Sequence, residues 1–136
     1  MSQRAIYPLE VHNGLLLLRA AISDGIRQPV IARLLVDTGA SFTILSTQIL
    51  EDAGCNLQSL QGSVAIAAAS GIVRGKIVEV PIFSVLGQTM QKFRVVGFNL
   101  PKSVDMDGLL GIDFMRSCSA IVDIGKACIT ISRTLS

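Results

Sequence analysis

The sequence predicts one mostly β domain, a partly closed barrel with one or two short helices. Short apolar runs rich in Val, Ile and Leu recur along the chain, and turns containing Gly, Asn or Asp separate them. Half of the 136 residues are hydrophobic, which is enough to build a core at this length. No linker, repeat or low-complexity tract divides the chain, so we expect a single domain over residues 1–136.

The N-terminal part contains predicted strands and one predicted helix. Asn13-Gly14 predicts a hairpin between YPLEV and GLLLLRAAI, because this dipeptide favours the tight turn that hairpins need. Ser23-Asp24-Gly25 predicts another turn, after which PVIARLLVD and SFTILS are expected to be extended. TQILEDAG is the one early segment that favours a helix, with Ser46 as its N-cap and Gly54 as its end.

The C-terminal part contains two predicted hairpins joined by a further strand. SVAIAAASGIVRGKIVEVPIF predicts two long strands around a tip of small residues, Ala69-Ser70-Gly71. Gly87-Gln88 separates this hairpin from the strand QKFRVVGF. GIDFMRS predicts a helical turn or two, with Asp113 as the expected cap. SAIVDI and ACITIS form a last predicted hairpin across Gly125-Lys126.

Composition argues against several classes of protein. The formal net charge is only +2, and the chain has one Tyr and no Trp, so we expect no nucleic-acid surface. No apolar run reaches the roughly 20 residues that span a bilayer. The three cysteines lack C-x-x-C spacing and indicate neither a disulfide framework nor a zinc site. We expect buried free thiols, a cytoplasmic location, no membrane segment, and no metal or organic cofactor.

The stretch LLVDTGASFTIL places one acid, Asp37, between large apolar residues and very small ones. An ionised carboxylate in that setting is costly unless hydrogen bonds or a chemical role compensate it. Thr38, Gly39 and Ala40 are short enough to leave the carboxylate accessible from a cleft. Two such acids facing each other would share a proton and act as acid and base on one water. Because the chain has one D-T-G, the second acid must come from a second copy.

With these residues the sequence resembles the retropepsin-like (retroviral-type) aspartic proteases. The resemblance rests on D-T-G-A-S at Asp37 to Ser41, on the apolar-apolar-Gly element Leu109-Leu110-Gly111, and on the glycine-bearing hairpin tip between them. It implies a homodimeric aspartic endopeptidase that acts on an extended peptide or protein substrate. In related enzymes the terminal strands often interleave, which makes MSQRAIY and ISRTLS candidates for the dimer interface.

The resemblance also implies roles for single residues. Asp37 would be the catalytic acid, Thr38 would hydrogen-bond across the dimer axis, and Gly39 would offer its carbonyl to the substrate backbone. Leu109-Leu110-Gly111 would support the catalytic loop from behind. The hairpin tip would close over the peptide as a flap, although it lacks the glycine-dense pattern of viral flaps. The implied substrate-binding residues are Ala40, Ser41, Ala69, Ser70, Gly71 and Ile72.

The sequence also allows interpretations other than a free-standing peptidase. A retropepsin-like fold that binds peptides or dimerises without chemistry is the alternative from another class, and the chain can also be the protease segment of a polyprotein or membrane-tethered precursor. DMDGLL, from Asp105 to Leu110, matches the nucleophile motif of haloacid-dehalogenase-type phosphatases. Those enzymes need a buried strand before the motif and a long α/β domain after it. Asp105 and Asp107 are therefore predicted to be loop carboxylates.

We expect structural rather than chemical roles for the histidine and the phenylalanines. His12, the only histidine, lies in a predicted turn and is expected to be solvated. A Cys-His nucleophile pair is left open, although no cysteine has an activating context. The five phenylalanines are expected to pack in the core: Phe42, Phe83, Phe93, Phe98 and Phe114.

Overall fold

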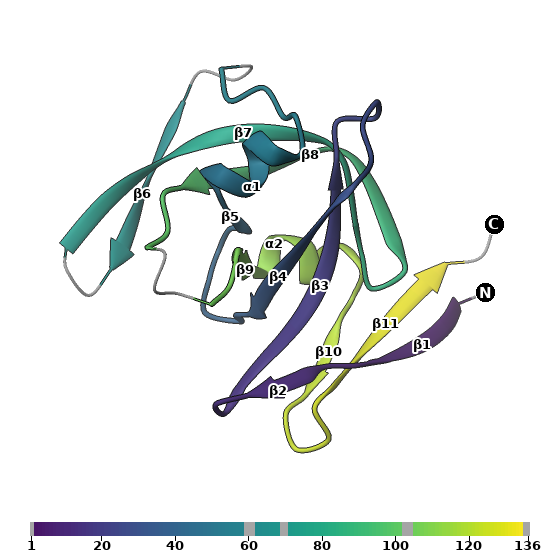
Figure 1. Ribbon diagram of the computed structural model, residues 1–136. Coiled ribbons are helices and arrows are strands. Elements are labelled where there is room, and N and C mark those ends of the chain that lie inside the picture. Colours follow the sequence, from purple (N-terminus) through teal and green to yellow (C-terminus); the bar gives the residue numbers. More distant parts are fainter. Residues whose placement is uncertain (1, 59–61, 69–70, 102–104, 135–136) are drawn as a thin grey trace.

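The computed structural model describes residues 2–58, 62–68, 71–101 and 105–134, and within them it confirms the mostly β prediction (Figure 1). The strands are β1 (Ser2–Pro8), β2 (Glu10–His12), β3 (Leu15–Ser23), β4 (Val30–Val36), β5 (Ile44–Ser46), β6 (Ser63–Ala68), β7 (Gly71–Val85), β8 (Gln88–Phe98), β9 (Gly108–Leu110), β10 (Ile121–Asp123) and β11 (Cys128–Thr134). The helices are α1 (Thr47–Asp52) and α2 (Ile112–Ser117). Among the described residues, neither helix has the length and apolar content that a bilayer crossing requires.

Six strands close into a barrel. The larger sheet has the order β2-β3-β4-β9-β5-β8-β7-β6, and β3 also pairs with β7. This extra pairing runs from Ala21↔Ser84 to Ser23↔Ile82 and joins the two sides of the sheet. The ring therefore consists of β3, β4, β9, β5, β8 and β7, while β2 and β6 extend from it (Figure 1). Closure gives each of these six strands a partner on both sides, which limits the unpaired edges that promote aggregation.

An aromatic cluster ties α2 to the barrel. Phe83 of β7 and Phe93 of β8 stack with ring centroids 5.0 Å apart, and Phe114 of α2 meets both rings edge-on at 5.6 and 5.9 Å. Such pairs add stabilisation beyond the area they bury. The expected core packing is confirmed for these three rings, and Phe98 is half-buried. It is wrong for Phe42, whose surface is 47% exposed.

The two terminal strands pair with each other within one chain. β1 and β11 are antiparallel over seven residues, from Ser2↔Thr134 to Pro8↔Cys128, and β10 pairs with the other side of β11. The predicted strand YPLEV is therefore wrong as a single element, because Tyr7 and Pro8 belong to this sheet whereas β2 pairs with β3. Leu9 lies at the junction, where its N–H donates to the Ala127 carbonyl (2.8 Å).

Three of the predicted turn and cap signals are confirmed here. Asn13 and Gly14 both adopt positive φ (50° and 76°), as a two-residue hairpin turn requires. Ser46 caps α1, with its Oγ accepting a hydrogen bond from the Ile49 N–H (3.1 Å). Gly54 follows the helix at φ 81°, a conformation that glycine adopts without steric cost.

The three thiols differ in exposure, which predicts different reactivity. Cys55 and Cys118 are buried and Cys128 is half-buried. Burial raises the pKa of the Cys55 and Cys118 thiols, and the charge of Asp24 adds to this effect at Cys55. Because the thiolate is the reactive form, we expect iodoacetamide near neutral pH to label Cys128 about tenfold faster than the others. Mass spectrometry over a time course measures this; equal labelling of all three in the folded protein would contradict it, and Cys128→Ser is the control.

Candidate active site

Asp37 directly follows β4, and backbone contacts hold its position. Its N–H donates to the Leu110 carbonyl (3.1 Å), which continues the parallel pairing of β4 with β9 by one step. Asp37 Oδ1 accepts from the Gly39 N–H (2.9 Å), and the Ala40 N–H donates to the Asp37 carbonyl (3.2 Å). A Cβ at Gly39 would lie 3.3 Å from Asp37 Oδ1, which is a tight contact. Glycine therefore lets the backbone come close to the half-buried carboxyl group.

The Leu109-Leu110-Gly111 element lies against the loop that carries Asp37. β9 is parallel to β4 on one side and antiparallel to β5 on the other. The Ile112 N–H donates to the Ala40 carbonyl (2.9 Å). A Cβ at Gly111 would lie 2.6 Å from the Phe42 carbonyl group and 2.9 Å from the Ala40 oxygen, so only glycine fits here. The expected support of the loop from behind matches this geometry.

Thr43 and Asp113 form a polar contact behind the same loop, and sequence reasoning missed it. The Asp113 carboxylate accepts from the Thr43 N–H (2.9 Å), from Thr43 Oγ1 (2.8 Å) and from the Phe114 N–H (2.8 Å). Thr43 Oγ1 in turn accepts from the buried Gly111 N–H (3.1 Å). The prediction that Asp113 caps α2 is wrong, because the N-cap is Gly111 and Asp113 bonds to the segment before β5. Single polar residues inside the apolar runs FTIL and GIDF were the available signal, since buried polar groups require partners.

A hollow of about 310 Å³ lies beside Asp37. Its walls are mostly apolar, and β6 contributes one of them through Ala65 and Ile66. Pockets that bind apolar side chains are likewise lined mostly by apolar residues, with a few polar groups that orient the ligand. Among the described residues, its lining consists of Asp37, Gly39, Ala40, Ser41, Phe42, Ile44, Ala65, Ile66 and Leu109. The structure thus brings Asp37, Gly39, Ala40 and Ser41 together, and it adds Phe42 at a position where core packing was expected.

The other predicted site residues lie elsewhere. Thr38 is exposed and lines a separate hollow of about 500 Å³, together with residues of α2 and the segment that leads into β10. Gly71 begins β7, and the Ile72 side chain is 77% exposed and does not line the hollow beside Asp37. The expected tip residues Ala69 and Ser70 lie outside the described residues. The flap therefore stays a prediction at its tip.

Comparison with solved structures finds the same fold in proteins of low sequence identity. A retropepsin-like aspartic protease from Rickettsia conorii matches with a TM-score of 0.70 at 18% identity, covering 97% of this chain and 93% of that one. The EIAV protease with the inhibitor HBY-793 matches at 0.54 and 20% identity, covering 74% and 85%. The retroviral protease-like domain of Ddi1 from Leishmania major matches at 0.57 and 19% identity, covering 86% and 87%. These likenesses establish a retropepsin-like fold.

Comparison of the sequence with family models identifies the family. Curated protein sequences gave no match. The model described as "gag-polyprotein putative aspartyl protease" matches residues 27–117, more than half of the chain. The matched region begins before β4 and ends with α2, so it contains Asp37, the hollow beside it and β9. The chain belongs to the gag-polyprotein aspartyl protease family.

Proposed function

We propose that this chain is an aspartic endopeptidase that hydrolyses peptide bonds with a water activated by two Asp37 carboxylates, one from each chain of a homodimer. The observation that carries the proposal is the position of Asp37 in a chain of this family. Its half-buried carboxyl group is held by the Gly39 N–H at the edge of an apolar hollow. An acid placed in this way can meet both a water and the backbone of a peptide whose side chain fills the hollow.

The chemistry follows from two acids that share one proton. The ionised Asp37 takes a proton from water as the water attacks the scissile carbonyl carbon, and the protonated Asp37 gives its proton to the carbonyl oxygen. When the tetrahedral intermediate collapses, the C–N bond breaks and the amine leaves with a proton from one carboxyl group, while a hydroxyl group of the intermediate returns its proton to the other carboxylate and so restores the shared proton. Ala40 and Ser41 contact the peptide next to the cleaved bond, and the tip at Ala69, Ser70, Gly71 and Ile72 closes over it. No covalent enzyme intermediate forms.

A second copy is needed because each chain supplies one D-T-G. Two features of the surface support association. Thr38 is exposed, so it is accessible to a partner chain. The register of the terminal sheet places Ile6, Thr130 and Ile121 side by side on one face, and the two isoleucines are 69% and 54% exposed. Because β1 and β11 pair within the chain, this sheet offers a preformed surface rather than free strands that interleave.

Mixing wild-type chains with Asp37→Asn chains tests the shared site. Peptides cleaved by the wild type are first identified in a mixed library by mass spectrometry, across acidic to neutral pH. After the two forms exchange subunits, random pairing at equal amounts should lower the activity per wild-type chain to about half, because mixed dimers lack one acid. Asp52→Asn, which changes an exposed acid of α1, is the matched control and should cause no loss.

The results of these experiments distinguish a site shared by two chains from a site within one chain and from a module that only binds peptides. Activity per wild-type chain that is unaffected by Asp37→Asn would mean that one chain holds a complete site, and it would reject the dimer mechanism. Binding of an extended peptide without cleavage at any pH would instead favour a binding module with a retropepsin-like fold. Sedimentation of the same mixtures shows whether dimers are present when cleavage occurs.

A further inference from the structure

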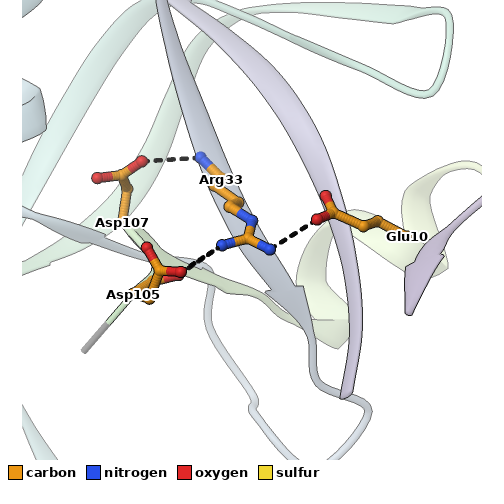
Figure 2. Close-up of polar contacts among 4 residues, drawn as sticks. All are labelled: Glu10, Arg33, Asp105 and Asp107. Carbon is orange, nitrogen blue, oxygen red and sulfur yellow. Dashed lines mark hydrogen bonds and ion pairs between the residues drawn. The ribbon is translucent and has the colours of Figure 1, made fainter. Parts of the chain in front are cut away.

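Arg33 lies on β4, four positions before Asp37, and three acids surround it (Figure 2). Its Nη2 is 2.6 Å from Glu10 Oε1, and its Nη1 is 2.8 Å from Asp105 Oδ2 and 3.2 Å from the Asp105 carbonyl oxygen. These bonds, the one to Glu10 most of all, raise the pKa of Arg33 above its usual value. The guanidinium therefore joins β2 to the segment that leads into β9.

Asp107 completes the arrangement through the backbone. Its N–H donates to the Arg33 carbonyl (2.7 Å), and its Oδ2 accepts from the Arg33 N–H (2.8 Å). On its other side, the Asp107 carbonyl accepts from the Ser46 N–H (2.8 Å), at the junction of β5 and α1. Asp107 thus binds both neighbours of β9 at the residue before that strand begins. We call Glu10, Arg33, Asp105 and Asp107 the Arg33 clamp.

The acidic residues of the clamp offset an electrostatic repulsion between two arginines of the barrel. Arg19 of β3 lies directly opposite Arg33 in the β3–β4 register, so their side chains project from the same face. Like charges directly opposite each other destabilise a strand pair. Glu10 and Asp105 bring negative charge to Arg33 and offset this term, although both acids are solvent-exposed, at 44% and 82%. The exposed ion pairs alone are therefore weak contacts.

The clamp lies at one end of β9, and Asp37 is held at the other. β9 has only three residues, and its last residue, Leu110, provides the carbonyl that accepts the Asp37 N–H. Because β9 is so short, contacts that fix its start relative to β4 and β5 also fix the position of its last residue, Leu110. Leu109 and Leu110 are both apolar, so these two side chains alone specify register weakly. Gly108 and Gly111 restrict the register by shape, because an added Cβ at either one would collide with backbone of the segment from Ala40 to Leu45. The polar contacts of Asp107 are specific to one register.

We propose that Asp107, together with Arg33, is a positioning residue for Asp37: it fixes the register of β9 against β4 and β5 and so the position of the Leu110 carbonyl that holds the Asp37 backbone. This assigns a role to the D-M-D segment, whose two acids bind the side chain and the backbone of the same arginine. The kinetic part of the proposal rests on the proposed peptidase function, whereas the structural part does not.

Backbone amide hydrogen exchange, read residue by residue by NMR, tests the clamp without requiring activity. Asp107→Ala removes the acceptor for the Arg33 N–H, and we expect exchange at the Asp37 amide to become about tenfold faster, as for the loss of one hydrogen bond, while the β11 amides keep their rates. Asp107→Asn keeps an oxygen acceptor and should stay within about threefold of the wild type. Asp105→Ala is the matched control, since it removes only an exposed ion pair and should leave the Asp37 amide unchanged.

Kinetics supply a second readout if the chain cleaves peptides. Asp107→Ala should lower kcat about tenfold with KM within about twofold, because a misplaced acid impairs the reaction more than peptide binding. Asp107→Asn should restore kcat. A wild-type chain that cleaves nothing would reject the peptidase function and leave the exchange test intact.

Equal Asp37 exchange in Asp107→Ala and Asp105→Ala would overturn the positioning role. If Asp107→Ala does not fold, Arg33→Met carries the test. That variant loses the bonds to Glu10 and to the carboxylate and carbonyl of Asp105 but keeps the backbone bonds to Asp107. We then expect Asp37 exchange to rise about threefold, a smaller effect because the main-chain pair survives. No change in Arg33→Met relative to Asp105→Ala would again overturn the proposal.

Discussion

Asp37→Asn is expected to reduce kcat/KM for peptide hydrolysis by about a thousandfold or more, because acid and base steps contribute factors of this size and both need the same residue. The substituted amide keeps the shape of the side chain, and its oxygen can still accept from the Gly39 N–H. The fold and the hollow beside residue 37 should therefore persist. Initial rates on a peptide selected from a library, measured with the wild type and Asp37→Asn at equal concentration, give the ratio.

Peptide binding by the same variant distinguishes a lost reaction from a lost fold. Calorimetric titration should show that Asp37→Asn binds the substrate peptide within about tenfold of a wild-type affinity measured with a non-cleavable analogue, since the apolar lining is unchanged. Asp52→Asn should retain full activity. Cleavage that survives in Asp37→Asn would move the chemistry away from this residue and would refute the proposed mechanism.

Gly111→Ala is expected to lower the stability of the fold strongly. The new methyl group would lie 2.6 Å from the backbone carbonyl group of Phe42 and 2.9 Å from the Ala40 oxygen. Both contacts are with backbone of the loop that carries Asp37, so no flexible side chain can move aside. Overpacking of this kind costs about 3 kcal/mol, which corresponds to a fall in Tm of about 10 °C for a domain of this size. Thermal unfolding followed by circular dichroism measures the change.

Gly125→Ala is the matched control for this substitution. Its added Cβ would meet only Asp123 Oδ1 at 3.7 Å, an ordinary contact, so Tm should change by no more than about 2 °C. We also expect Gly111→Ala to lose hydrolysis at temperatures where it remains folded, since the displaced loop contains residues 37–43. A Gly111→Ala variant with the stability of the wild type would show that β9 and this loop are less tightly packed than the structure indicates.

Several features of the site were predictable because their signals are local or carried by the motif. The D-T-G-A-S segment identified the loop, and the residues around Leu109-Leu110-Gly111 identified the strand behind it. Asn13-Gly14 and the cap at Ser46 depend on residues within a few positions, and both were predicted correctly. The roles of Asp37, Thr38 and Gly39 in catalysis stay predictions until the kinetic tests are made.

Other features depend on partners far apart in the sequence. Phe42 was expected in the core, yet its surface is 47% exposed and it lines the hollow beside Asp37, together with residues of β6. Asp113 was expected to cap α2, but Thr43, 70 positions earlier, supplies donors from another element. In both cases a local preference was outweighed by a contact that forms only after the barrel has closed.

The sequence by itself determined the mostly β class, the position of the turns, the candidate acid and the glycine-bearing strand behind it, because these follow from residue types and short spacings. Only the tertiary structure decided that β3 pairs with β7, that β1 pairs with β11 in the same chain, and that Asp107 binds the Arg33 backbone 74 positions away. Apolar alternation specifies which face of a strand is buried and leaves its neighbours undefined. Neighbours and register are set by long-range hydrogen bonds and packing, and here these contacts position Asp37.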